Sequence, residues 1–371
     1  MKHLILATAG LAVASMTVGA QASAAFNADD RYDIFVITPD KQVQWYQSDG
    51  TAHGVSLVST LPGINDAYNL AGGDLDGDGK GDLLVVRNDA TGWPGNLVEI
   101  TQAQLSWLRS DGTATGVETV NAAMGPAHLY VDAAIGDMDG NGVGEVHWTR
   151  LTSTDLLSGN SASYDGVDDL TGVTATLGAT NWVHGADMNG DGSRDFLVVR
   201  EAGLRVRGVG ASSTTFNDAE NHMASTVVEI DATTKTVQGL MDVAVGDLDG
   251  DGTLDIIGVV DTGALRWFEY DALTPNLTFR EEFGSGAASV AIADLDGDGV
   301  DTLLVGGDGS GVTWYEWDGS QLADVGGTPF AASGALSIVV FTVPEPASVA
   351  LLGGGVGVLL LGRRRRRRPI R

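Results

Sequence analysis

Short apolar runs recur along the chain in pairs, with an acidic, glycine-containing segment between the two members of each pair. The runs are three to six residues long and rich in Val, Ile and Leu, which is typical of buried strands rather than helices. We expect each pair to form two strands joined by a hairpin-like loop. The first runs cover 68–73, 131–136, 241–246 and 288–293, and the second runs cover 83–86, 196–199, 256–260 and 303–305.

A third apolar run in several of these units contains a tryptophan. The residue two before each tryptophan is aliphatic and shares its strand face, so we expect Trp45, Trp107, Trp267 and Trp314 to face the packed interior. The alternative is that these rings stack on sugars. The runs cover 43–50, 105–112, 265–271 and 312–319, and the third and fourth units lack the tryptophan.

The acidic segments between the paired runs share a nine-residue pattern. Carboxylates or amides occupy positions 1, 3 and 5, an acidic residue usually occupies position 9, and glycine occupies positions 4 and 6. Oxygen ligands at this density suit a hard cation such as calcium, and the glycines let the backbone curl so that alternate side chains converge. Ordinary acidic turns do not explain five copies of one spacing. The copies are 74–82, 137–145, 187–195, 247–255 and 294–302.

Two other calcium motifs do not fit these segments. An EF-hand requires a bidentate Glu at position 12. Here that position holds Val85, Trp148, Val198, Gly258 and Val305. Glycine-rich nonapeptides of calcium-dependent β-helices must repeat in tandem, whereas these loops start 47 to 63 residues apart. The period therefore fits one supersecondary unit per loop.

The two ends of the repeat region predict ring closure. Asn27, Asp29 and Asp33 match positions 3, 5 and 9 of a sixth loop that lacks a preceding strand, while 335–341 is a first strand with no loop after it. The ends would then complete one sheet, which is how a propeller removes its free edge. We predict an all-β fold: a β-propeller of four-stranded blades over 26–341, closed by its N- and C-terminal strands, with six blades or, as the alternative, seven.

The recurring D-x-D-G-D-G loop and W-Y-x-x-D-G strand resemble the integrin-α-type repeat, also called the FG-GAP or VCBS repeat, over nearly all of 26–341. In that family, side chains at positions 1, 3, 5 and 9 and the carbonyl at position 7 hold calcium, which here implies three to five ions. The implied metal ligands are Asp74, Asp76, Asp78, Lys80 and Asp82; Asp137, Asp139, Asn141, Val143 and Glu145; Asp187, Asn189, Asp191, Ser193 and Asp195; Asp247, Asp249, Asp251, Thr253 and Asp255; and Asp294, Asp296 and Asp298.

The loops differ in how closely they follow the pattern, and these differences predict an order of calcium affinity. Asn141 and Asn189 lower the ligand charge, which should weaken binding. Thr302 replaces the position 9 carboxylate of the fifth loop and leaves Asp301 one residue out of place. The fifth loop is therefore the weakest of the five candidates, and the split sixth loop is weaker still.

Both termini indicate export. Residues 1–25 predict a secretory signal peptide, because Lys2 and His3 precede an apolar segment and a small-residue cleavage site. In 342–371, Pro344, Glu345 and Pro346 precede an expected transmembrane helix at 347–362 and an arginine block. This order resembles a PEP-CTERM sorting signal. The resemblance implies a Gram-negative bacterium, transient anchoring in the inner membrane, processing by an exosortase and an association with exopolysaccharide.

Charge and cysteine content restrict the partners. The net charge is −28 although the tail contributes a block of arginines, and this excludes nucleic acid and anionic membrane surfaces as direct partners. The chain has no cysteine, so disulfides do not stabilise it and bound metal is expected to do so.

Motifs for catalysis are lacking in the sequence. It has no G-x-S-x-G, no H-E-x-x-H, no cysteine nucleophile and no phosphate loop, and its six histidines share no metal or triad spacing. We therefore expect no catalytic residues and no enzyme. The leading hypothesis is an exported calcium-binding module for interaction or adhesion at the cell surface or in the matrix, with an extracellular protein or polysaccharide ligand. The alternatives are a lectin-like glycan binder and, after it, a polysaccharide lyase or hydrolase.

Overall fold

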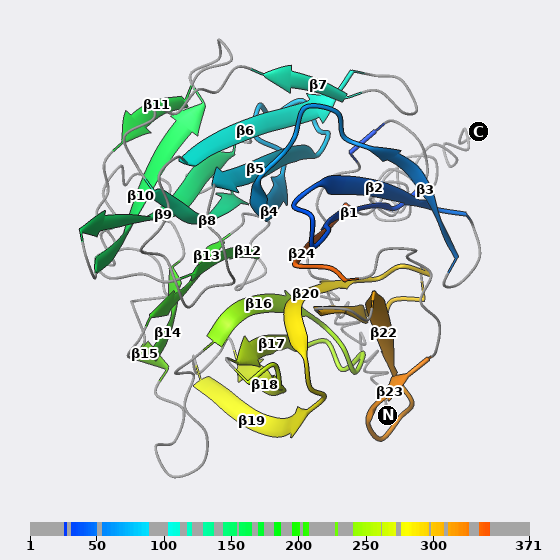
Figure 1. Ribbon diagram of the computed structural model, residues 1–371. Coiled ribbons are helices and arrows are strands. Elements are labelled where there is room, and N and C mark those ends of the chain that lie inside the picture. Colours follow the sequence, from blue (N-terminus) through cyan, green and yellow to red (C-terminus); the bar gives the residue numbers. More distant parts are fainter. Residues whose placement is uncertain are drawn as a thin grey trace, which may run out of the picture.

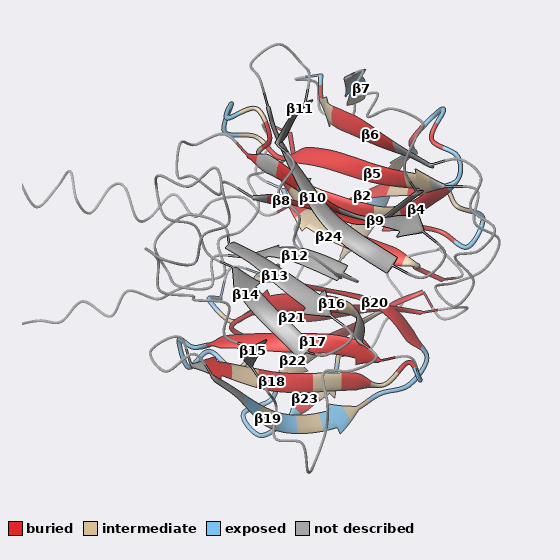
Figure 2. Ribbon diagram, turned by 90° about the vertical axis from the view of Figure 1, so that its left-hand side faces the viewer, coloured by how far each residue is buried: buried red, intermediate tan, exposed pale blue. Residues whose placement is uncertain are grey.

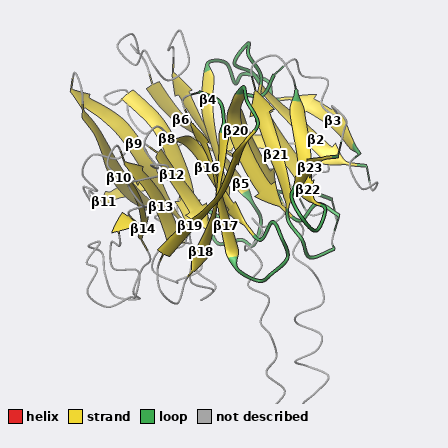
Figure 3. Cartoon of the chain, turned by 90° about the horizontal axis from the view of Figure 1, so that it is seen from below, coloured by secondary structure: helices red, strands yellow, loops and turns green. Residues whose placement is uncertain are grey.

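The regular structure consists of strands arranged in a ring (Figure 1), and Figure 3 shows these strands from below that view. The computed structural model describes residues 26–27, 31–49, 54–88, 103–111, 117–120, 129–136, 144–153, 156–164, 170–173, 182–186, 195–200, 203–207, 227–228, 240–260, 262–271, 276–296, 298–307, 311–325 and 334–341. In these ranges no helix has the length and apolar character needed to span a membrane. The expected signal peptide, sorting motif and transmembrane helix lie outside them.

The strands form six antiparallel sheets of four strands, and each sheet is one blade (Figure 1). The prediction of an all-β propeller with four-stranded blades is confirmed. From the axis outward, the blades are β24 (Ser337–Phe341), β1 (Asp33–Ile37), β2 (Val43–Ser48) and β3 (Val55–Thr60); β4 (Ala67–Gly73), β5 (Asp82–Asn88), β6 (Ala103–Ser110) and β7 (Val117–Val120); β8 (Leu129–Gly136), β9 (Glu145–Ser153), β10 (Leu156–Tyr164) and β11 (Leu170–Val173); β12 (Trp182–Ala186), β13 (Asp195–Arg200), β14 (Gly203–Arg207) and β15 (Val227–Val228); β16 (Leu240–Gly246), β17 (Leu254–Val260), β18 (Leu265–Asp271) and β19 (Asn276–Phe283); and β20 (Ala287–Ala293), β21 (Thr302–Gly307), β22 (Val312–Trp317) and β23 (Leu322–Asp324).

Strands from both ends of the repeat region close the ring within one blade. β1 pairs along its whole length with β24, with Phe35 opposite Val339. Phe26, Phe35 and Phe341 pack around this seam, with ring centroids 4.8 Å apart for Phe26 and Phe35 and 5.7 Å apart for Phe35 and Phe341. The expected completion of one sheet by the two ends is confirmed.

The expected hairpins and tryptophan strands are also present. β4 with β5, β16 with β17 and β20 with β21 are antiparallel pairs, each joined by one of the acidic loops. Trp45, Trp107, Trp267 and Trp314 are between 0 and 3% exposed. Figure 2 shows β6 and β18, which carry Trp107 and Trp267, as mostly buried. The prediction that they face the interior is confirmed, and stacking of these four rings on sugars is excluded.

The innermost strands carry a shared feature that the sequence analysis did not find. β4, β8, β16 and β20 each have a bulge immediately before a polar residue, which is Asn69, Asp132, Asp242 or Ser289. These side chains bond to the next blade: Asn69 Nδ2 donates to Asp132 Oδ1 (2.5 Å), and the backbone N–H of Val290 donates to Asp242 Oδ2 (3.0 Å). A polar belt near the axis therefore joins consecutive blades.

Candidate metal sites

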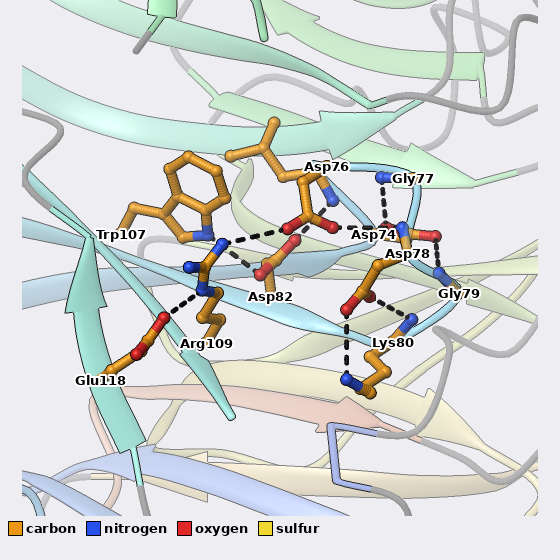
Figure 4. Close-up of polar contacts among 11 residues, drawn as sticks. Asp74, Asp76, Gly77, Asp78, Gly79, Lys80, Asp82, Trp107, Arg109 and Glu118 are labelled. Atoms are coloured by element: carbon orange, nitrogen blue, oxygen red, sulfur yellow. Dashed lines mark hydrogen bonds and ion pairs between the residues drawn. The ribbon is translucent and has the colours of Figure 1, made fainter. Parts of the chain in front are cut away.

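The loop that begins at Asp74 joins β4 to β5 and brings three carboxylates together (Figure 4). Side-chain oxygens of Asp74, Asp76 and Asp78 lie within 4.8 Å of one another. Gly77 and Gly79 have φ angles of 75° and 82°, a left-handed conformation that favours glycine. Their N–H groups donate to the two oxygens of Asp74 at 2.8 and 2.9 Å. The backbone therefore curls around the position 1 carboxylate, as the glycine spacing predicts.

The loops that begin at Asp247 and Asp294 repeat this arrangement. Their oxygens at positions 1, 3 and 5 again lie within 4.8 Å of one another. In both loops the N–H at position 6 donates to the position 1 carboxylate, from Gly252 at 2.9 Å and from Gly299 at 3.0 Å. The two further triads are Asp247, Asp249 and Asp251, and Asp294, Asp296 and Asp298. Below, the three described loops are named the Asp74, Asp247 and Asp294 loops.

The donor set in each loop fits a hard divalent cation. Three carboxylates share a small volume, and like charges this close repel one another unless a cation or a proton is present. Burial raises the pKa of Asp74, and the nearby carboxylates of Asp78 and Asp76 raise it further, against the opposing effect of the glycine N–H groups. Burial likewise raises the pKa of Asp247 and of Asp296. Calcium, which takes six to eight oxygens, would supply the missing positive charge.

The position 9 carboxylates are not among these triads, and they act as anchors. Asp82 accepts from Trp107 Nε1 at 2.9 Å through one oxygen and from the backbone N–H of Leu75 at 2.7 Å through the other (Figure 4). Asp255 does the same with Trp267 Nε1 at 2.6 Å and Leu248 N–H at 2.9 Å. Each position 9 residue therefore ties the start of its loop to the tryptophan on the third strand.

The same bond forms in the blade that closes the ring. Trp45 Nε1 donates to Asp33 Oδ1 at 2.7 Å. The same spacing of 12 residues separates Asp33 from Trp45 and Asp255 from Trp267 in the sequence, and the structure shows that it corresponds to this hydrogen bond. Burial raises the pKa of Asp82 and of Asp255 to about 7, because the interior disfavours the charged form of both carboxylates.

The Asp294 loop replaces this anchor with another one. Thr302 stands at position 9, and the neighbouring Asp301 is buried against the preceding blade. Asp301 Oδ2 accepts from Asp247 N–H at 2.7 Å, and Asp301 N–H donates to Asp247 O at 3.0 Å. By its position in the sequence Asp301 is a ligand one residue out of place, whereas in the structure its backbone and side chain connect two adjacent loops.

Gly144 shows that position 8 faces the preceding blade elsewhere in the ring too. A Cβ at this residue would lie 2.4 Å from Asp74 O. The remaining predicted ligands of the second and third loops, at 137–143 and 187–194, lie outside the described residues.

Comparisons with known proteins agree with this repeat geometry. A family model for the FG-GAP-like repeat matches residues 26–85, 187–258 and 247–305, which contain the Asp74, Asp247 and Asp294 loops in full and end within β5, β17 and β21. The chain contains FG-GAP-like repeats. Similarity therefore covers both the loop and its flanking strands in these repeats, and no match was found among curated proteins.

Solved structures share the propeller fold at low identity. The periplasmic gluconolactonase PpgL of Pseudomonas aeruginosa is 14% identical, with a TM-score of 0.52 over 85% of this chain and 100% of that one. The BP39L lectin of Burkholderia pseudomallei is 15% identical, with a TM-score of 0.49 over 85% and 86% of the two chains. At this identity the gluconolactonase shows the fold alone.

The expectation that the protein is not an enzyme is corrected by this comparison. It depended on missing catalytic motifs, yet a gluconolactonase has the same architecture as these FG-GAP-like repeats. Propellers host many activities, and their catalytic groups lie on loops rather than in short motifs. The absence of such motifs therefore does not argue against catalysis.

Proposed function

We propose that this protein is an exported propeller whose blades are held by calcium and whose surface serves interaction or adhesion outside the cell. The observation that carries the proposal is the threefold recurrence of a triad of carboxylates, at equivalent places in three hairpins of FG-GAP-like repeats. One acidic turn has many explanations. Three turns that share the N–H bond from position 6 to the position 1 carboxylate favour a shared ligand.

In this proposal calcium stabilises rather than reacts. Asp74, Asp76 and Asp78 and their counterparts in the other loops hold the ion, and position 9 and its tryptophan fix the loop against the blade. With a dissociation constant of about 10⁻⁴ M and millimolar calcium outside the cell, each filled site would add about 1.4 kcal/mol. Several sites together would be comparable with the whole stability margin of a domain.

The proposed destination follows from the termini and the charge. A signal peptide, a PEP-CTERM-like tail and a net charge of −28 support export in a Gram-negative bacterium, with exosortase processing. An extracellular protein or a polysaccharide is the proposed ligand. Because the four tryptophans above are buried, a glycan-binding surface would use other residues.

A thermal melt with millimolar calcium and with chelator, combined with a count of bound metal, tests the proposal. We expect a large rise in melting temperature with calcium and three to five ions bound. Magnesium is the control, because it demands near-octahedral geometry and dehydrates reluctantly, so it should stabilise much less. An unchanged melting temperature with no stoichiometric calcium would refute the metal assignment.

The proposed interaction has its own measurement. Cosedimentation of the calcium-loaded protein with exopolysaccharide from exosortase-containing cells should retain the protein, and chelation should release it. If the same amount of protein were retained with and without calcium, binding of the polysaccharide would not depend on the metal.

A further inference from the structure

Two of the three described loops have an arginine at the carboxylate of position 3. Arg109, on β6, places Nη1 3.3 Å from Asp76 Oδ2 (Figure 4). Arg280, on β19, forms an ion pair through Nη2 with Asp249 Oδ2. The two arginines come from different strands of their blades, the third and the fourth, and yet reach the same loop position.

Each arginine also has a second acidic partner away from the loop. Arg109 Nε pairs with Glu118, the residue opposite it on β7. Arg280 Nη1 lies 3.3 Å from Glu269 Oε2, and its guanidinium lies 5.1 Å from the ring centroid of Trp267. The second partner keeps the guanidinium beside the loop while leaving it room to shift from the position 3 carboxylate.

The Asp294 loop differs at this point. Within the described parts of the chain, no ion pair involves Asp296, its position 3 residue. Burial raises the pKa of Asp296, and the negative charges of Asp298, Asp294 and Glu316 raise it further. The position 3 carboxylate of this loop is therefore not paired with an arginine of the described residues, unlike those of the other two loops.

We propose that Arg109 and Arg280 set the calcium affinity of their loops by acting as competing internal cations. A guanidinium stays charged at all accessible pH values, so it both occupies the position 3 carboxylate and repels an incoming divalent ion. The inference rests on the proposed calcium binding. It reverses the order of calcium affinity that the number of carboxylate ligands predicts. The Asp294 loop lacks a carboxylate at position 9, where it has Thr302, and yet it becomes the tightest of the three described sites.

Calcium titration calorimetry of the full-length protein, after chelation, tests the role of Arg280. We expect Arg280→Gln to tighten one class of sites about fivefold to tenfold, since the lost charge is near the ion but partly exposed and screened. Arg280→Lys keeps the positive charge, so its calcium affinity should stay within about twofold of that of the wild type. The limit is about twofold because exposed ion pairs contribute little free energy.

Arg266→Gln is the matched control. Arg266 belongs to the same blade and pairs at 2.9 Å with Glu282, which is not a loop carboxylate, so its removal takes away one positive charge of the blade by breaking a pair outside the loop. Equal tightening by Arg266→Gln and Arg280→Gln would overturn the proposal in favour of a general charge effect. Unchanged or weaker binding in Arg280→Gln would also overturn it.

Two further arms complete the design. Arg109→Gln should tighten a site in the other blade, and Asp296→Asn should abolish the tightest class in the wild type. Survival of that class in Asp296→Asn would refute the new ranking while leaving calcium binding intact. A wild type that binds no calcium at all would instead refute the proposed function.

Discussion

The Asp247 and Asp294 loops belong to neighbouring blades and share their first six positions, yet they are held in different ways. In the Asp247 loop, Asp255 connects the start of the loop to Trp267 within the same blade. In the Asp294 loop, Thr302 takes that place and Asp301 bonds across to Asp247. The first anchor stabilises a blade, and the second stabilises the contact between two blades.

This difference shows that the motif has two separate roles, which are to gather carboxylates and to connect the loop to its surroundings. Positions 1, 3 and 5 gather carboxylates in all three described loops, whatever follows them. Positions 8 and 9 connect the loop to its surroundings, and there the residues vary. A change at position 9 therefore need not remove a metal site, because its main contacts are with a tryptophan and a backbone N–H group.

The largest expected effect comes from removing the anchor within the blade. Asp255→Ala would leave two buried donors, Trp267 Nε1 and Leu248 N–H, without their acceptor, at a cost of about 2–4 kcal/mol. Thr302→Ala, at the equivalent position of the other loop, should cost less than about 1.5 kcal/mol. Denaturant unfolding in chelator would measure both. Equal losses for the two variants would contradict the distinction.

The clasp between blades should have a smaller effect. Asp301→Ala removes the acceptor of Asp247 N–H and should cost about 1–3 kcal/mol. Asp301→Asn keeps a carbonyl acceptor and removes the buried charge, so without metal it should be as stable as the wild type or more stable. Unfolding curves at neutral pH compare the two. If the Asn variant were destabilised as much as the Ala variant, the carboxylate itself would be required.

The expectation that is easiest to measure is the dependence of stability on pH without metal. Burial raises the pKa of Asp255 and of Asp301 to about 7 and that of Asp242 to about 6, above the usual value for an unfolded chain of about 3.9. The folded state thus holds more protons than the unfolded state between these values. Stability should fall as the pH rises from about 4 to 7.

Melting temperatures in chelator at pH 5 and pH 8 measure this slope. We expect the higher value at pH 5, and calcium should reduce the difference, because the ion supplies at pH 8 the positive charge that protons supply at pH 5. A higher melting temperature at pH 8 in chelator would show that other ionisable groups control the slope.

Much of the fold could be predicted because strand pairs, turns and packing repeat with the same local pattern. The runs 68–73 and 241–246 correspond to β4 and β16 within one residue at the first end, and the incomplete ends correctly indicated one shared sheet. Convergence of the carboxylates at positions 1, 3 and 5 also followed from local sequence, because glycine fixes the curl of the loop.

The contacts that escaped prediction are those between segments far apart in the sequence. Asp301 acts on a residue 54 positions earlier, and Asn69 on one 63 positions later. Arg109 and Arg280 reach equivalent carboxylates from non-equivalent strands, so no repeat alignment would pair them. The anchor between position 9 and the tryptophan did leave a signal in the sequence, which is the spacing of 12 residues shared by Asp33 and Trp45 and by Asp255 and Trp267.

Closure of the ring by β1 and β24 also governs when the molecule can finish folding. The partners are about 300 residues apart, so the seam must wait for the last strand to be synthesised and, if the chain is exported as we propose, to be translocated. Until then β1 presents an open edge, which invites pairing with other chains. Pairing of β1 with Ser337–Phe341 therefore competes in time with pairing of the same edge with other chains.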